Sequence, residues 1–182
     1  MRIRSGILIA CLLSALAACS DEGPPPTSSM LPDSVDQVAY GFTTYITQEG
    51  VEIARIEADS AFHYPASQEW NLYGLRVEFR TTRGVLRSTV TAREGTYLWR
   101  TGDMEARDSV VAFTPDGRQL TTCSLGYEKA TDQIIGACDF VFDAPPDRHL
   151  EGESFLADPD FRDVRAVNPR RGRAGDVEVE RP

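Results

Sequence analysis

The stretch Trp70-Asn-Leu-Tyr-Gly-Leu-Arg-Val-Glu-Phe-Arg80 decides the fold. In its second half, the apolar residues Leu75, Val77 and Phe79 alternate with charged ones, so that one face is apolar and the other charged. This period of two is typical of a β-strand that is buried on one side only. Gly74 stands where the apolar alternation changes phase, which predicts a β-bulge that re-aims the strand.

The rest of the chain consists of similar short alternating runs separated by turn residues, a pattern that indicates an antiparallel sheet. Helical periodicity is nearly absent. Only Asp33 or Ser34 is placed to cap a helix, a short one running to about Tyr40. The remaining breaks imply about nine or ten strands. These breaks fall at residues 48–50, 64–69, 82–84, 93–95, 101–103, 115–117, 129–132 and 144–147.

A hairpin motif recurs at intervals of about 30 residues. Each copy has a small residue, then an aromatic four or five positions later, as in Ala58 and Phe62, and then a second apolar strand. Copies begin at Ala58, Ala92 and Thr122, and Leu150 begins a partial fourth. One hairpin is too thin to be stable alone, whereas stacked hairpins bury a continuous apolar inner face. The predicted fold is therefore all-β, an antiparallel sheet built from repeated hairpins.

The N-terminus has the features of an export signal. Arg2 and Arg4 precede an apolar run over residues 7–18, and Leu16-Ala-Ala-Cys19 follows the pattern of a bacterial lipobox. The run is shorter than the roughly 20 residues that span a bilayer. We predict a signal peptide over residues 1–18, lipidation at Cys19 and a Pro-rich flexible linker over residues 19–31. The alternative is an ordinary secreted protein in which Cys19 occurs by chance.

The rest of the chain is long enough for one domain, which we place at residues 32–168, followed by a disordered tail at residues 169–182. The chain has 28 acidic and 19 basic side chains, a formal net charge of −9. This balance argues against nucleic-acid partners. Arginines at positions 170, 171 and 173 form the only basic cluster, and they lie in the predicted tail.

Cysteine usage agrees with export to an oxidising compartment. Apart from the signal and the lipidation position, only Cys123 and Cys138 remain, and a lone pair in the periplasm predicts one disulfide. A two-residue turn at 130–131 would place Tyr127 opposite Ile134 and Cys123 opposite Cys138. Directly opposed strand residues can reach disulfide distance.

No catalytic, metal-binding or cofactor-binding motif stands out. His63 and His149 lie in or beside turns without metal-ligand spacing, and neither a nucleophile elbow nor a phosphate-binding loop is present. Asp158 and Asp160 carry oxygens of the kind that calcium takes, but no EF-hand-like loop surrounds them. We therefore predict no enzymatic activity, no cofactor and no metal.

Several runs, taken in order, resemble LptC, the periplasmic component of the lipopolysaccharide export machine. The resemblance covers roughly residues 33–167. The runs are Ala54-Arg-Ile-Glu-Ala-Asp-Ser-Ala-Phe62, Trp70-x-Leu-x-Gly-Leu-x-Val-x-Phe79, Ser88-Thr-Val-Thr-Ala-Arg-Glu-Gly-Thr-Tyr97, Met104-Glu-Ala106, Asp116-Gly-Arg-Gln-Leu-Thr121 and Gly152-Glu-Ser-Phe-Leu-Ala-Asp-Pro159. The related LptA proteins share such signatures, but an N-terminal membrane anchor favours LptC. Two departures are Asp108-Ser109, where the family often has Gly-Asn, and a lipobox where many relatives keep a transmembrane helix.

The resemblance implies an open β-jellyroll whose apolar interior holds the acyl chains of lipopolysaccharide. It also implies that one end meets the transporter subunits LptF and LptG, and the other an LptA-like bridge protein. Such a protein would lie on the periplasmic face of the inner membrane, although sorting to the outer membrane stays open. From the repeat we expect these side chains to point inward, each within one residue: Val77, Phe79, Val90, Met104, Val110, Leu120 and Phe140.

Two functions of other classes remain as alternatives. One is a structural or adhesive envelope lipoprotein whose β core is packed and closed. The other is a lipid-anchored hydrolase that uses Ser or Asp residues. Bound acyl chains, or measured transfer of labelled lipopolysaccharide, would distinguish a carrier from both.

Overall fold

The computed structural model describes residues 35–173. The predicted signal peptide, Cys19 and the linker lie outside this range, as do residues 174–182. Within the described range, no helix is long and apolar enough to cross a lipid bilayer.

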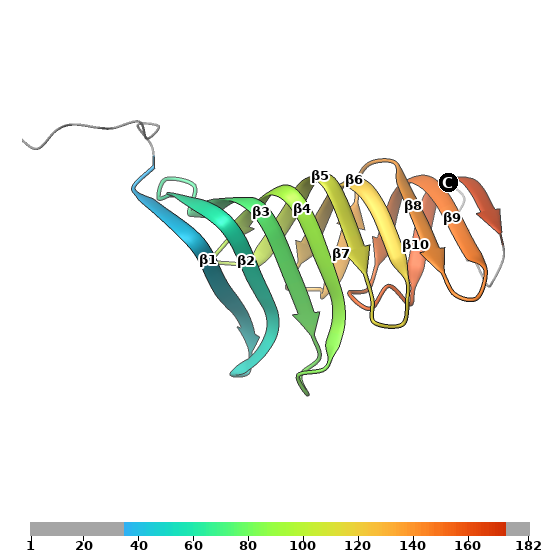
Figure 1. Ribbon diagram of the computed structural model, residues 1–182, viewed down its shortest axis with the longest axis horizontal. Coiled ribbons are helices and arrows are strands. Elements are labelled where there is room, and N and C mark those ends of the chain that lie inside the picture. The colour runs from blue at the N-terminus through green and yellow to red at the C-terminus, as the bar shows by residue number, and fades with distance from the viewer. Residues whose placement is uncertain (1–34, 174–182) are drawn as a thin grey trace, which may run out of the picture. The chain divides into compact units, whose positions relative to one another are not determined.

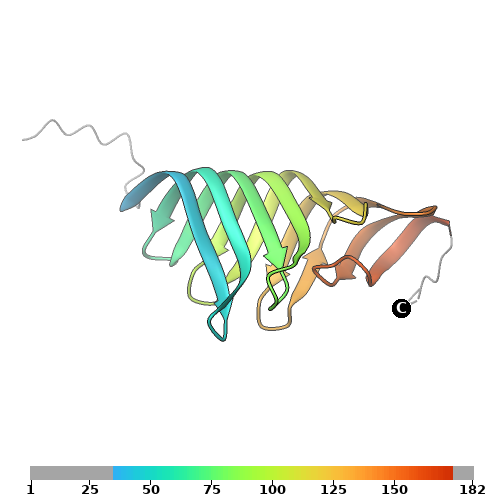
Figure 2. The same cartoon turned by 60° about the horizontal axis from the view of Figure 1, so that its bottom comes forward.

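The described residues form one antiparallel sheet of ten strands (Figure 1). The strands are β1 (Gln37–Gln48), β2 (Val51–Tyr64), β3 (Glu69–Arg80), β4 (Leu86–Leu98), β5 (Asp103–Phe113), β6 (Gln119–Glu128), β7 (Gln133–Gly136), β8 (Phe140–Ala144), β9 (Arg148–Ala157) and β10 (Val164–Arg173). Neighbours in sequence are neighbours in space, except that β7 and β8 both lie between β6 and β9. Figures 1 and 2 show the strands following one another from β1 at one end to β10 at the other. The prediction of an all-β protein built from hairpins is confirmed.

Most predicted turns coincide with the observed strand ends, but several local expectations differ from the structure. Residues 93–95 lie inside β4, and the short helix expected to run to Tyr40 is wrong because residues from Gln37 onward belong to β1. Val38 and Ala39 pair with Phe62 and Ala61 of β2, and this pairing outweighs a weak helix cap. In addition, β10 runs to Arg173, beyond residue 168 where we placed the end of the domain.

In each long strand, the alternation of inward-facing and outward-facing side chains shifts by one position near the middle. We call this shift a parity change. In β3, Leu72 is buried, the next two residues are exposed, and Leu75 is buried again. Gly74 makes this change at φ +67°, a conformation that glycine adopts without strain. The pairing register to β4 is the same on both sides of Gly74, so the expected extra-residue bulge is absent there. In β5, Asp108 and Ser109 both have positive φ, and the register to β6 shifts beside them.

These parity changes line up across the strands and define a line that we call the crease. The small residues of the sequence repeat, Ala58, Ala92 and Thr122, lie next to it in β2, β4 and β6. Close packing at the crease explains their size. At Gly95, an added Cβ would stand 2.5 Å from Leu75 Cδ2 and 2.8 Å from the Glu105 carbonyl oxygen.

The crease divides the sheet into two arms whose apolar sides face each other. The first arm consists of the strand halves that carry Tyr97, Met104 and Tyr127. The second arm consists of the strand halves that carry Val77, Val90 and Leu120. We call the space between them the interior. One buried apolar cluster fills it and runs from β1 to β10. A single folded sheet thus supplies both walls of its own core.

Candidate functional site

All seven side chains expected to point inward are buried in the cluster between the arms. The most exposed of them is Met104, at 9%. All except Met104 lie on the second arm, because the clearest alternation in the sequence belongs to that half of each strand. The structure therefore brings the seven together on one apolar surface. The contact of these side chains with acyl chains remains a prediction.

Among the inward-facing side chains of the first arm, only Met104 was predicted from the sequence. The buried side chains of this arm follow the alternation of the other strand halves, but the parity change at the crease makes that alternation hard to read in the sequence. These side chains include Leu72, Tyr97, Ala106, Leu125, Tyr127, Ile134, Phe155 and Ala157. The signal that could have located them is the aromatic residue of each repeat, because Tyr97 and Tyr127 are both buried here.

The interior is filled more completely toward β10 than toward β1. Phe142 and Phe155 are no more than 1% exposed, and the Phe140 and Phe155 rings pack with centroids 4.8 Å apart. Toward β1, Phe42 and Trp70 are only partly buried, although their rings are 5.0 Å apart. The arms thus close on one another in the C-terminal half.

Polar contacts join the rims of the two arms. Arg87, at the start of β4, donates from Nη1 to Asp132 Oδ2 at 2.9 Å and lies 3.4 Å through Nε from Asp160 Oδ1. Next to it, the buried Ser88 hydroxyl donates to the Pro159 carbonyl oxygen at 2.6 Å. Asp132 belongs to the turn between β6 and β7, and Pro159 to the segment between β9 and β10. Both partners lie at the rim of the first arm.

The segment 158–163 between β9 and β10, which we call the strap, is held in shape by its own hydrogen bonds. Asp158 Oδ1 accepts from the backbone N–H groups of Arg162 and Asp163, each at 2.9 Å. Phe161 is 1% exposed and has φ +51°, a conformation that costs a bulky residue about 1–3 kcal/mol. Burial of its ring, worth about 1.5–3 kcal/mol, offsets that cost.

A second arginine ties the strap to the second arm. Arg148, at the start of β9, donates from Nη2 to the Val164 carbonyl oxygen at 3.3 Å and from Nη1 to that of Arg162 at 3.5 Å. Its guanidinium lies 5.3 Å from the centre of the Phe142 ring. The strap is therefore fixed near both of its ends, by Arg87 and Ser88 on one side and by Arg148 on the other.

Tyr127 links the interior to these rim contacts. Its hydroxyl donates to Asp132 Oδ1 at 3.1 Å. Burial, and next the charge of Asp132, raise the pKa of Tyr127 well above its usual value, so the phenol stays protonated and keeps donating. Asp132 is thereby positioned to receive Arg87.

The two cysteines of the folded part lie at the crease, where residues 137–139 separate β7 from β8. Their Cα atoms are 6.2 Å apart, within the range that a disulfide spans. The predicted register is confirmed at Tyr127 and Ile134. It does not extend to the cysteines as directly opposed strand residues, because β7 ends at Gly136 and Cys138 lies between β7 and β8. Oxidation of the pair in the cell remains a prediction.

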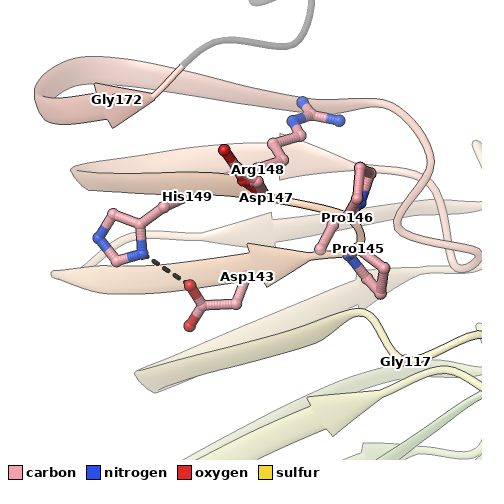
Figure 3. A pocket seen from close by; sticks show the side chains of 9 residues that line it. Gly117, Asp143, Pro145, Pro146, Asp147, Arg148, His149 and Gly172 are labelled. Atoms are coloured by element: carbon pink, nitrogen blue, oxygen red, sulfur yellow. Dashed lines mark hydrogen bonds and ion pairs between the residues drawn. The ribbon is translucent and has the colours of Figure 1, made fainter.

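A surface hollow lies outside the interior, around the turn between β8 and β9 (Figure 3). Here His149 Nδ1 lies 2.6 Å from Asp143 Oδ1, and Nε2 lies 2.9 Å from Glu151 Oε1. Hydrogen bonds to Asp143 and then to Glu151 raise the pKa of His149, which favours the imidazolium form. His149 therefore bridges the carboxylates of Asp143 and Glu151 in an ion-pair group at the protein surface.

Candidate catalytic and metal groups are dispersed over the structure. His63 Nδ1 lies 2.7 Å from Asp36 Oδ1, and the His63 ring packs 4.8 Å from Trp70. Asp158 directs its carboxylate to backbone N–H groups of the strap. Within residues 35–173, no group of three or more His, Cys, Asp or Glu side chains is arranged to hold a metal ion.

The sheet has two unpaired edges, β1 and β10. Every second N–H and C=O group of an edge strand lacks a partner within the sheet, and a strand of another protein can use these groups. The β1 edge spans Gln37–Gln48 and exposes Tyr40 and Tyr45. The β10 edge includes Pro169, which has no N–H to donate.

An antiparallel sheet folded along a crease, with an apolar interior and two free edges, defines an all-β protein of the jellyroll class. The sequence matches the family model described as lipopolysaccharide-assembly, LptC-related, over residues 6–137. The chain therefore belongs to this family, which acts in lipopolysaccharide transport in the periplasmic part of the cell envelope. No curated protein matches the sequence closely enough to add a named relative.

Proposed function

We propose that this protein is a lipid-anchored carrier. It would accept lipopolysaccharide from an inner-membrane ABC transporter and pass it along its interior to an LptA-like bridge. The observation that carries the proposal is the apolar cluster that runs without interruption from Ile46 in β1 to Ala166 in β10. Its walls are mainly apolar or aromatic, and the buried polar residues among the described ones are Ser88, Thr89, Thr114 and Thr122.

The energy of an exposed acyl chain explains why such an interior would serve. Leaving a chain of about 12 carbons in water costs on the order of 10 kcal/mol, at about 0.8 kcal/mol for each CH₂. A carrier that shields the chain throughout its passage removes that barrier without chemistry of its own. In this mechanism the protein supplies a surface and a route, and the transporter supplies the driving force.

Lipid entry requires the arms to separate, because side chains already fill the space between them. Separation exposes apolar surface, which the incoming acyl chains cover again. The partly buried Phe42 and Trp70 make the β1 end the easier place to begin. We therefore assign lipid entry to the β1 end and exit to the β10 end.

The two edges would connect the carrier to its neighbours by strand addition. β1 is the strand closest in sequence to Cys19, the proposed site of lipid attachment. We therefore assign the β1 edge to the transporter subunits LptF and LptG, and the β10 edge to the bridge protein. One acyl chain binds a bilayer only marginally, whereas the two or more chains of a bacterial lipoprotein make a lasting anchor.

Site-specific photo-crosslinking tests the carrier function. A diazirine analogue of leucine replaces Leu75, which points into the interior, or Leu98, which is 36% exposed and serves as the control. In cells that export lipopolysaccharide, we expect crosslinks from position 75 and none from position 98. Equal crosslinking at both positions, or none at either, would contradict the proposal.

One observation favours a second candidate function. Phe142, Phe155 and Leu150 fill the C-terminal half of the interior so completely that a closed structural core also fits. In an envelope protein of purely structural or adhesive function, these side chains would contact only each other. The same crosslinking experiment distinguishes the two functions, because a closed core gives no lipid adduct at position 75.

A further inference from the structure

The strap lies outside the strands of the sheet but contributes buried side chains to the interior. It places Phe161 and Pro159, both almost fully buried, between the rims of the arms. Elsewhere the walls are strands whose backbone groups are paired with neighbouring strands. The strap contacts the second arm through the side chains of Arg87, Ser88 and Arg148.

The contacts across the rims are unevenly distributed along the sheet. Near β1, the ion pairs of Glu52 with Arg55 and Arg80 stay within the second arm, and that of His63 with Asp36 stays on the side of the first arm. The rim contacts of Arg87, Ser88 and Arg148 all involve the strap or the turn beside it. These contacts therefore hold the rims together in the C-terminal half. Among the contacts described above, none joins the two rims in the half near β1.

We propose that the strap is a latch: acyl chains enter the C-terminal half of the interior only after the strap leaves its contacts with Arg87 and Ser88. This inference rests on the proposed carrier function. In the closed state the Phe161 ring occupies volume that an acyl chain would take. Release of the strap removes the ring, separates the rims and opens the path toward the β10 edge.

The ion pair between Arg87 and Asp160 is of a kind that can break and form again. Arg87 is 15% exposed and Asp160 is 27% exposed, so water can replace either partner when the pair separates. The hydrogen bonds inside the strap do not depend on Arg87, and the strap can therefore move as one unit. Burial of the Phe161 ring offsets the cost of its positive φ, so an acyl chain that displaces the ring would remove this compensation and favour release.

Two measurements on the full-length protein test the latch. Hydrogen exchange followed by mass spectrometry reports the opening of the strap, whose Phe161 N–H donates to the Asp158 carbonyl oxygen at 2.8 Å. Photo-crosslinking to lipopolysaccharide in exporting cells compares a leucine diazirine at Leu75 with one at Leu150 in the C-terminal half.

The variants are Arg87→Ala and the milder Asp160→Asn, in case loss of Arg87 impairs folding. Arg93→Ala is the control, because the Arg93–Asp108 pair is exposed and distant in sequence from the strap.

We expect Arg87→Ala to speed exchange in the strap about tenfold, the effect of losing roughly 1.4 kcal/mol of local opening free energy. Crosslinking at position 150 should rise several-fold, while crosslinking at position 75 and all results for Arg93→Ala stay at the wild-type level. Faster exchange without a rise at position 150 would overturn the latch, as would unchanged exchange in both Arg87→Ala and Asp160→Asn. Absence of crosslinks at position 75 in every protein would instead overturn the carrier function, and the latch with it.

Discussion

Phe79 of the second arm and Tyr127 of the first arm pack across the interior, with ring centroids 4.7 Å apart and ring planes tilted by 60°. The pair joins β3 to β6, strands that are not neighbours in the sheet. It shows directly that the two arms face each other. It also identifies a position where one substitution can change the interior without touching either edge.

We expect Phe79→Asp to prevent lipid loading. A carboxylate at a position that is 2% exposed loses several kcal/mol of hydration without gaining a partner. Crosslinking to lipopolysaccharide from position 75 should be lost while circular dichroism retains the β signal. Phe79→Leu keeps the surface apolar and should load normally, and Phe113→Asp, at an exposed position, is the control for added charge. A folded Phe79→Asp protein that crosslinks normally would show that Phe79 does not contact lipid.

We predict that Cys123 and Cys138 are oxidised in the periplasmic protein. Closing a loop of about 15 residues contributes roughly 3 kcal/mol in the chain-entropy model. Replacing both cysteines by serine should lower the free energy of unfolding by about that amount, measured by urea denaturation. Mass spectrometry of the alkylated native protein provides the direct check, and two free thiols would contradict the prediction.

Close packing at the crease predicts that Gly95→Ala destabilises the protein. Its new Cβ would press on the Leu75 side chain and the Glu105 backbone, and such overpacking typically costs about 1–3 kcal/mol. Gly126→Ala is the matched control, because the nearest atom to its new Cβ is the Ile135 carbonyl oxygen at 3.7 Å. Urea midpoints of the two variants measure the difference. Equal midpoints would show that the crease tolerates a side chain at Gly95.

His149 should make stability depend on pH. Its pKa is raised above the value of 6.5 by the hydrogen bonds of the folded state. Such a group stabilises the fold fully below its unfolded pKa, and this contribution is lost as the pH rises through the folded pKa. His149→Gln should therefore lower the urea midpoint more at about pH 5.5 than at about pH 8.5. The opposite order would mean that the neutral imidazole is the form favoured by folding.

Cys19→Ala should release the protein from membranes without unfolding it. The motivation is the lipobox, followed by a Pro-rich stretch with no core residues. Membrane fractionation and immunoblotting measure the release, and they also decide between inner and outer membrane. Cys11→Ala is the control, because Cys11 lies in the predicted signal peptide and should not affect anchoring. A Cys19→Ala protein that still sediments with membranes, with no protein partner holding it, would contradict lipid anchoring.

Local patterns predicted the hairpins and one pairing register. The turn at residues 129–132 was sufficient to place Tyr127 opposite Ile134, because a tight turn fixes the pairing of the strands that it joins. Local patterns did not predict most of the side chains with which the first arm lines the interior. The parity change at the crease is visible in the sequence at Gly74, but residues 93–95 read as a turn although β4 continues through them.

The strap could not be predicted from the sequence. Its contact between Ser88 and Pro159 joins positions 71 residues apart, and neither residue is part of a recurring motif. Asp158 and Asp160 suggest at most a solvated strand end, whereas one shapes the strap and the other reaches Arg87. Such contacts depend on how the arms close, which is a property of the whole sheet.

The crease also determines how the capacity of the interior can change. Both walls are made of the same strands, and their ladder hydrogen bonds run between neighbouring strands rather than across the interior. A change in the angle between the arms therefore alters a few backbone dihedrals in each strand and leaves the ladders intact. The volume between the walls is thus adjustable. Under the proposed carrier function, such a sheet would accommodate lipids that differ in the number of their acyl chains without exchanging one set of backbone pairings for another.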